Sequence, residues 1–167
     1  MKYQYLIFIV SSIFMFGCAS DKYSAQRITY NAAQEIQSRT NVNDIIAVIN
    51  ASPSRDDLNM QIITWLESHL LNTGKFKIVS RQRIDTVMKE LHFGITGYVS
   101  DTSAQSLGKL LGAKYILVFE LKNVHNKSYL NIQVLETETA ALVYSNSFRI
   151  NNAVKNINTE KSKPLRF

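Results

Sequence analysis

The only cysteine of the sequence, Cys18, is the residue whose position points to a definite chemistry. It follows a charged start with Lys2 and an apolar run from Tyr5 to Phe16 that only two serines interrupt. The run is too short to span a bilayer as a mature helix, so it predicts an export signal that is removed. An incidental buried thiol is the alternative, but the charged start and apolar run favour a processed cysteine. Because no second cysteine is present, no disulfide can stabilise the mature chain.

The residues just before Cys18 resemble the bacterial lipobox, in which a small residue such as Gly17 precedes the cysteine. In that motif the thiol receives a thioether-linked diacylglycerol, and cleavage makes the cysteine the mature N-terminus. We therefore expect residues 1–17 to be a lipoprotein signal peptide and residues 18–43 to be a lipid anchor and tether. The expected location is the bacterial cell envelope, in the outer membrane facing the periplasm.

Charge gives weaker information about partners. The net charge is +6, and part of the surplus lies in residues 151–167, which carry four cations against Glu160 and which we expect to form a basic flexible tail. A solvated end is favoured, and contact with anionic lipid or glycan is the alternative. No nucleic acid is expected as a partner, because no basic helix with interleaved aromatic residues is present.

Side chains that could catalyse a reaction are not grouped in this sequence. The histidines His69, His92 and His125 are expected in a helix, a loop and a turn, without the spacing of metal ligands. The pair Asp56 and Asp57 is explained by capping of a helix. No nucleophile elbow or phosphate-binding loop is present. We therefore expect a protein that is not an enzyme and has no metal or cofactor besides the covalent lipid on Cys18.

The remaining sequence predicts one domain. The 150 residues that follow the signal peptide can form a single core. Polar residues 19–43 predict a tether with at most one weak helix. After them, hydrophobic periodicity and turn signals predict the following elements: a buried central strand at 44–51, a helix capped by Ser54 and Asp57 that ends near Gly74, a half-buried strand at 75–80, a helix around 84–91, a loop at 92–101, a helix capped by Thr102 that Gly112 ends, and strands at 115–121, 129–136 and 142–150.

This order, β-α-β-α-α-β-β-β, predicts a small α/β domain over residues 44–150. A mixed β-sheet is expected with helices against it, and the last three strands are expected to be antiparallel. In the strand at 129–136, Leu130 and Ile132 should face the core, while Asn131 and Gln133 should face water.

The stretches LLNTGKFKIVSRQRIDTVMKEL and DTSAQSLGKLLGAKYILVFEL, between Leu70 and Leu121, resemble a family of bacterial envelope lipoproteins. This family shares the fold of the curli secretion protein CsgG, the penicillin-binding-protein activator LpoB and the flagellar lipoprotein FlgO, and is similar to the N-terminal domain of TolB. Lys114 and Ala140 stand where the family usually has Asp and Gly.

The resemblance implies structural roles for three glycines: Gly74 and Gly112 at helix ends, and Gly108 where a helix approaches the sheet. Arg81 and Glu90 are candidate polar positions for partner contact. They could also fix their helix through an ion pair, or be solvated with little energetic effect.

Two functions follow from the resemblance. The first is a non-catalytic lipoprotein that binds and regulates a protein partner in the envelope, as an LpoB-like activator of a peptidoglycan synthase. The second is a CsgG-related subunit of a secretion or surface-assembly complex, curli-like or flagellar, with assembly into a homo-oligomer left open. Membrane hairpins for a complete pore would need roughly 40 residues, and the longest internal gap is the ten residues 92–101. The first function is therefore favoured.

Overall fold

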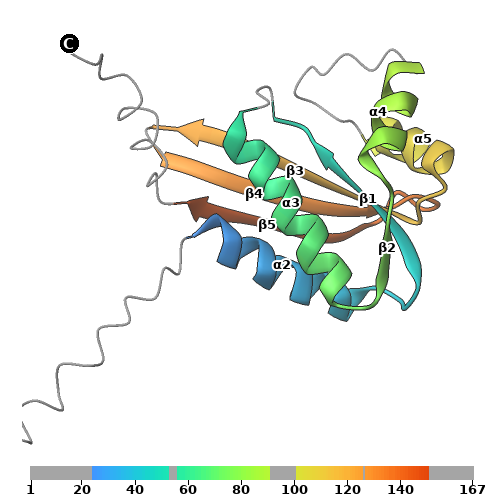
Figure 1. Cartoon of the computed structure of the whole chain (residues 1–167), viewed down its shortest axis with the longest axis horizontal. Coiled ribbons are helices and arrows are strands. Elements are labelled where there is room, and N and C mark those ends of the chain that lie inside the picture. The colour runs from blue at the N-terminus through green and yellow to red at the C-terminus, as the bar shows by residue number, and fades with distance from the viewer. Residues whose placement is uncertain (1–23, 53–55, 91–100, 126, 151–167) are drawn as a thin grey trace, which may run out of the picture.

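The computed structural model describes residues 24–52, 56–90, 101–125 and 127–150. One five-stranded mixed sheet forms the middle layer, and helices pack on both of its faces (Figure 1). The described elements follow one another along the chain in this order: α2 (Ala25–Arg39), β1 (Asp44–Asn50), α3 (Asp57–Asn72), β2 (Phe76–Ile78), α4 (Arg81–Glu90), α5 (Asp101–Leu111), β3 (Tyr115–Val124), β4 (Lys127–Glu136) and β5 (Leu142–Ile150).

The strands lie in the order β2-β1-β3-β4-β5. β1 pairs with β2 and β3 in parallel, whereas β3, β4 and β5 are joined as antiparallel neighbours. The antiparallel ladder places Glu120 opposite Asn131 and Asn131 opposite Ser147, and its register shifts once, between Val134 and Leu135 in the pairing of β4 with β5. The predicted α/β class, the central position of the first strand and the antiparallel last three strands are therefore confirmed.

α2 and α3 cover one face of the sheet. Their buried side chains join those of β1, β3, β4 and β5 in the larger core, which includes Ile36, Leu66 and Phe119. α4 and α5 pack on the opposite face around Ile49 and Ile116, in a smaller core. This second pair of helices therefore covers only part of its face, and none of the described helices covers the rest.

The segment predicted to be a tether contains a helix of the folded domain. Ser24 caps α2 by accepting a hydrogen bond from the Arg27 backbone N–H (3.3 Å), and Ala32, Ala33 and Ile36 are fully buried. The predicted domain start at residue 44 is therefore wrong, because folding already involves residues from Ser24 onward. The small alanines of α2 gave a weak hydrophobic signal although they allow the helix to approach the sheet closely.

Two predicted helix caps need correction, and one predicted loop lies almost wholly outside the described residues. α3 is capped by Asp56, whose Oδ1 accepts from the Asn59 N–H (2.9 Å), and the predicted cap Ser54 lies outside the described residues. α5 starts at Asp101, so Thr102 lies inside the helix rather than at its cap. The predicted loop at 92–101 falls almost wholly outside the described residues.

Candidate partner-binding surface

The half of the sheet that α4 and α5 leave uncovered forms a polar surface on β3, β4 and β5. Each of its side chains is exposed or half-buried, and their strand positions alternate with those of the buried core residues. We call this surface the open face and define it by Glu120, Lys122, Tyr129, Asn131, Gln133, Ser145, Ser147 and Arg149. The predicted division of β4 into a buried side and a wet side is confirmed, because Leu130 and Ile132 are fully buried.

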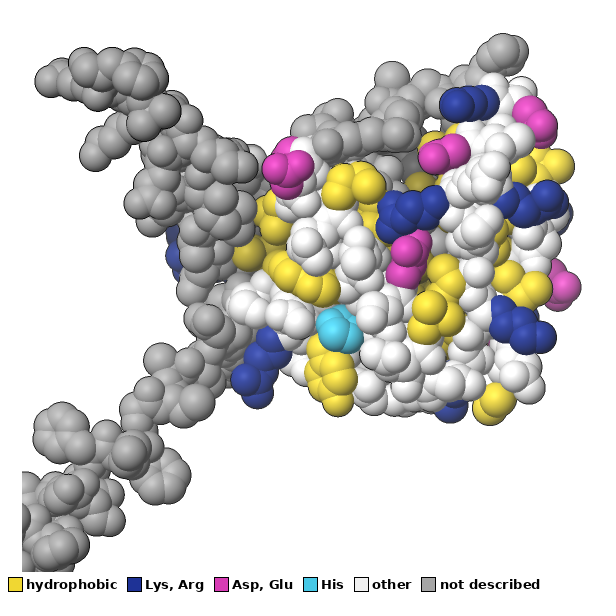
Figure 2. Space-filling model, in the orientation of Figure 1, with side chains coloured by type: hydrophobic (Ala, Val, Ile, Leu, Met, Phe, Trp, Pro, Cys, Tyr) yellow, Lys and Arg dark blue, Asp and Glu magenta, His cyan; other side chains and the backbone are white. Residues whose placement is uncertain are grey.

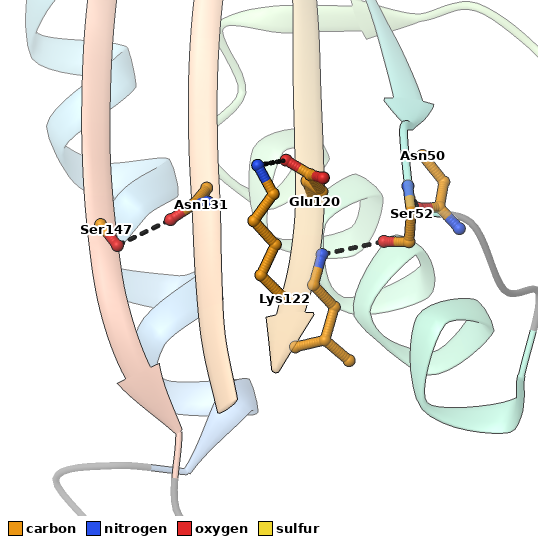
Figure 3. Close-up of polar contacts among 7 residues, drawn as sticks. Asn50, Ser52, Glu120, Lys122, Asn131 and Ser147 are labelled. Carbon is orange, nitrogen blue, oxygen red and sulfur yellow. Dashed lines mark hydrogen bonds and ion pairs between the residues drawn. The ribbon is translucent and has the colours of Figure 1, made fainter. Parts of the chain in front are cut away.

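A hydrogen bond and an ion pair each hold two side chains together on the open face (Figure 3). The Ser147 hydroxyl donates a hydrogen bond to Asn131 Oδ1 (2.6 Å), and Lys122 Nζ lies 2.8 Å from Glu120 Oε2. Both pairs project from backbone that is held by the antiparallel ladder. A partner would therefore meet amide, hydroxyl and charged groups whose positions are already restricted, which lowers the entropy cost of binding.

The rim of the open face is closed by the end of β1 (Figure 3). Ser52, which is only 1% exposed, accepts a hydrogen bond from the Leu121 N–H through its hydroxyl oxygen (2.8 Å). Asn50 Oδ1 accepts from the Ser52 N–H (2.8 Å). The Ser52–Leu121 bond continues the attachment of β1 to β3 beyond their last paired residues, Asn50 and Phe119, and the Asn50–Ser52 bond holds Ser52 next to the end of β1. The rim is thus rigid although regular strand pairing has ended.

A second, smaller site lies between α3 and α4. The chain leaves β1 for α3 on one face and leaves β2 for α4 on the other, so a crevice opens at the carboxyl ends of these two strands. The cavity measures about 100 Å³ and is lined mainly by apolar side chains, with Met60 and Met88 on its two helices and Asn50, Arg81 and Asp85 as its polar residues.

Arg81, a predicted contact residue, is engaged in a structural ion pair. Its Nη2 lies 3.1 Å from Glu67 Oε1, so that α4 is tied to α3. Burial raises the pKa of the Glu67 carboxyl, and the Arg81 charge opposes this shift. The other predicted residue, Glu90, is exposed at the last position of α4, a full helix length from Arg81. An ion pair of Arg81 does fix the helix, but its partner is Glu67, which the local sequence pattern gave no reason to select.

Lys114 shows what one departure from the family pattern does. Its Nζ lies 3.3 Å from Asp44 Oδ2 and thereby joins the start of β3 to the start of β1. The hydrogen bond to Asp44 raises the pKa of the Lys114 amine. This pair lies at the end of the sheet remote from the β3–β4 hairpin, so it stabilises the domain rather than the open face.

The predicted glycines occupy distinct structural positions. Gly74 and Gly112 follow helices with positive φ values of 71° and 64°, which a side chain would disfavour. A Cβ on Gly108 would lie 2.7 Å from Thr137 Cγ2 and 3.1 Å from Ile116 Cγ1. The Thr137 hydroxyl also donates to the Ala113 carbonyl (2.7 Å). α5 therefore contacts the sheet through a position that has no room for a larger residue.

The described part of the chain offers little for catalysis or metal binding. Within it, no three His, Cys, Asp or Glu side chains are grouped so as to hold a metal ion. His69 packs edge-on against the Tyr30 ring at 5.5 Å, and His125 lies at the β3–β4 turn. Cys18 and His92 are outside the described residues. None of the described helices is both long enough and apolar enough to cross a membrane.

Comparison with known proteins supports one of the predicted relationships. Residues 20–150 match the family model described as "Peptidoglycan-synthase activator LpoB". The LpoB C-terminal domain from Salmonella enterica aligns with a TM-score of 0.61 and 17% identity, over 79% of this chain and 98% of that domain. The LpoB C-terminal domain from Escherichia coli gives a TM-score of 0.55 and 19% identity, over 74% of this chain and 98% of the domain.

A solution structure of E. coli LpoB aligns with a TM-score of 0.57 and 17% identity, over 72% of this chain and 66% of that one. At these identities the structural matches establish the shared fold. A search of curated protein sequences gave no significant match. These results support the LpoB part of the predicted resemblance, but they do not support an assignment to the CsgG or FlgO type.

Proposed function

This chain belongs to the LpoB family of peptidoglycan-synthase activators, and from that premise we propose that it is a non-catalytic envelope lipoprotein that binds and stimulates a peptidoglycan synthase. The observation that carries the proposal is the family match over residues 20–150, which includes every described strand and helix. The regulatory role fits a domain whose described residues contain no cluster of three His, Cys, Asp or Glu side chains that could hold a metal ion.

The open face is the surface that we assign to the synthase. It combines a rigid backbone with polar side chains that are exposed rather than engaged in the core. The opposite face carries α2 and α3, where acidic and basic side chains are scattered among apolar ones (Figure 2). An interface that uses fixed amide and hydroxyl groups gains specificity, because a wrong partner leaves those groups without hydrogen bonds.

The experiment compares two glutamine substitutions of the same size and charge. Gln133→Arg introduces a long cation into the middle of the open face, whereas Gln61→Arg introduces it on the exposed side of α3. Each variant is purified and added to the peptidoglycan synthase of the same bacterium, and the rate of glycan polymerisation and cross-linking is measured. We expect Gln133→Arg to weaken binding by about tenfold, equivalent to about 1.4 kcal/mol, and to reduce stimulation.

The control Gln61→Arg should stimulate as the unmodified protein does, and both variants should keep its melting temperature, because exposed substitutions rarely change stability by more than about 0.5 kcal/mol. Equal stimulation by both variants would remove the open face from the proposal. Absence of stimulation by the unmodified protein would contradict the function itself.

Membrane attachment through Cys18 is the second part of the proposal. It is supported by the apolar run that ends at Phe16 and by the small residue Gly17 before the cysteine. Cys18→Ala should release the protein from the membrane fraction of the cell, since the thioether bond to diacylglycerol can no longer form. Unchanged membrane fractionation of this variant would show that another feature holds the protein at the membrane.

A further inference from the structure

One end of the domain gathers the points at which the described chain begins and ends. β3 and β4 meet there in a hairpin that pairs Val124 with Lys127, and Ser128 pairs with Ile150 at the end of β5. α2 starts at the same end, because its first-turn residue Ile28 shares a core with Ile150 while Arg39 at its other end stacks on Tyr144 near the start of β5. Figure 1 shows this end at the left, where α2 begins and the arrow of β5 finishes.

This end presents a group of exposed basic side chains. We call it the basic end and define it by Arg27, Lys122, Lys127 and Arg149. Lys122 and Arg149 flank Tyr129 in one cross-strand row of the open face, and the neighbouring Val124 is 45% exposed. A surface with several cations, a tyrosine and an exposed aliphatic side chain fits an interface between water and phospholipid headgroups.

Acidic side chains compensate this charge only in part. Glu120 is paired with Lys122 at 2.8 Å. Asp56 and Asp57 stand at the start of α3, which packs against α2 as well as over β1 and β2. Lys127, Arg149 and Arg27 therefore have no described ion-pair partner within 4 Å.

Arg27 occupies a position of α2 at which a positive charge lowers the stability of the helix. It lies in the first turn of α2, which contains no acidic residue. The positive end of the helix dipole is at this turn, so a guanidinium group there is repelled. A basic residue that opposes its own helix is explained more readily by an anionic partner outside the domain than by stability.

The sequences on both sides of the described residues also favour contact between the basic end and a membrane. Between Cys18 and Ser24 there are six residue steps, which reach at most roughly 20 Å when extended. Beyond Ile150 the sequence adds Lys155, Lys161, Lys163 and Arg166 against the single acidic residue Glu160. A lipid on Cys18 would therefore hold the basic end within a short distance of the bilayer, together with further cations.

We infer that the basic end rests on the anionic phospholipid headgroups of the membrane in which the Cys18 lipid is inserted, an inference that rests on the lipid anchor proposed above. The strands then rise away from the bilayer, and the middle of the open face, with Asn131, Gln133 and Ser147, points sideways. In this orientation the middle of the open face stays accessible, while the membrane contact uses Lys122 and Arg149 at the hairpin end of that face together with Arg27 and Lys127.

The test uses the chain from Ala19 onward, which lacks the signal peptide and the lipid but contains all of the described cores. It is sedimented with vesicles of phosphatidylcholine alone and with vesicles that also contain phosphatidylglycerol. We expect binding to the anionic vesicles only, with a decrease as salt is raised. The variant Lys127→Glu/Arg149→Glu should bind about tenfold more weakly or worse.

The matched control is Lys77→Glu/Lys109→Glu, which changes the net charge equally at the opposite end, where β1 and β3 start. It should bind as the unmodified chain does. Equal loss in both double variants would overturn the inference, because binding would then follow net charge. Unchanged binding of the Lys127→Glu/Arg149→Glu variant would overturn it as well.

Neither a synthase nor the Cys18 lipid is present in this assay. Its failure is therefore distinguishable from failure of the proposed function, which is measured by synthase stimulation and by membrane fractionation of the Cys18→Ala variant.

Discussion

At the residue scale, Tyr144 is the side chain whose pKa shifts most among the described residues. It is 2% exposed, and burial, together with the nearby Glu35 carboxylate, raises the pKa of its hydroxyl from 10 to about 12. In the unfolded chain the same group ionises near pH 10. Between pH 10 and 12 ionisation therefore favours the unfolded state, and the free energy of unfolding should fall as pH rises through this range.

Tyr144→Phe removes this ionisation and should make stability less dependent on pH above 10. Urea denaturation at pH 8, 10 and 11.5 measures the effect. Part of the alkaline loss should remain, because burial also raises the pKa of Tyr115. Tyr30→Phe, at a tyrosine that is 49% exposed, is the control and should leave the pH dependence unchanged. If the free energy of unfolding fell equally with pH above 10 in Tyr144→Phe and in the unmodified protein, ionisation of Tyr144 would not be the cause of the loss.

Ala140 carries a local conformational cost. It adopts a positive φ of 57° in the turn between β4 and β5. A Cβ is disfavoured in this left-handed region by roughly 1–2 kcal/mol, whereas glycine occupies it freely. Ala140→Gly should therefore raise the free energy of unfolding by about 1 kcal/mol, as measured by chemical denaturation. The exposed strand variant Ser145→Gly should lower stability instead, and a loss in Ala140→Gly would show that its φ is not strained.

At the element scale, α2 is the helix whose membership of the domain can be tested most directly. Ile36 is fully buried against the sheet, so Ile36→Ala should lower the free energy of unfolding by about 2–5 kcal/mol. Gln26→Ala, on the exposed side of the same helix, should change it little. Thermal or urea denaturation distinguishes the two. If α2 were only a tether, both substitutions would leave the stability of the domain unchanged.

The strands could be predicted from sequence because their signals are local. β1 and β3 are continuous apolar runs. In β4, apolar and polar residues alternate in the order Leu130, Asn131, Ile132, Gln133. A weak helix was allowed in the tether, but its place in the core was not predicted, because the contact side of α2 consists largely of alanine and threonine. Ile28, Ala32 and Ile36 nevertheless recur every four residues. That spacing was the available signal of a helix with one buried side. Only the tertiary packing shows that such small side chains are enough to hold the helix against the sheet.

Strand register was harder to predict than strand existence. Leu142 and Tyr144 lie two positions apart, so they would share a face of a regular strand, but Leu142 is 53% exposed and Tyr144 is buried. The reason is an irregularity in the pairing of β4 with β5, which sets Val134 opposite Tyr144 and Leu135 opposite Leu142. One extra residue on β5 turns Leu142 to the other face. The open face was likewise not predictable, because its extent depends on where α4 and α5 stop.

One half-buried ion pair, between Arg81 and Glu67, joins α4 to α3. Removal of the cation by Arg81→Met leaves the Glu67 carboxylate without its partner at a site where burial already raises its pKa. A raised carboxyl pKa means that the charged form costs stability at neutral pH and that acidification relieves this cost. Arg81→Met should therefore lose about 1–2 kcal/mol at pH 7, and the loss should shrink as pH falls toward 5.

The double variant Arg81→Met/Glu67→Leu provides the comparison for that prediction. It removes both charges and should recover most of the stability at pH 7, because an apolar pair can replace a buried ion pair without penalty. Denaturation at pH 5 and pH 7 for the two variants completes the test. A pH-independent loss in Arg81→Met would show that packing of the arginine chain, rather than its charge, holds the helices together.

At the scale of the whole molecule, the position of α2 changes the reach that the anchor allows. When residues 18–43 are taken as a tether, the domain can move on the order of 90 Å from the membrane. Because the folded domain already starts at Ser24, only six residue steps separate it from Cys18. The synthase surface that meets the open face must therefore come close to the membrane that holds the lipid.

This restriction predicts the effect of a longer linker. A flexible insertion of 20 Gly and Ser residues after Lys22 adds roughly 25 Å of average reach. If the synthase is already within reach, the longer linker lowers the effective concentration of the open face near the synthase. Stimulation in cells should then fall by a few-fold. The same insertion after Asn151 lengthens the chain without changing its reach and should leave stimulation unchanged. Greater stimulation from the longer linker would mean that the natural distance is limiting, so that the partner docks far from the anchoring membrane.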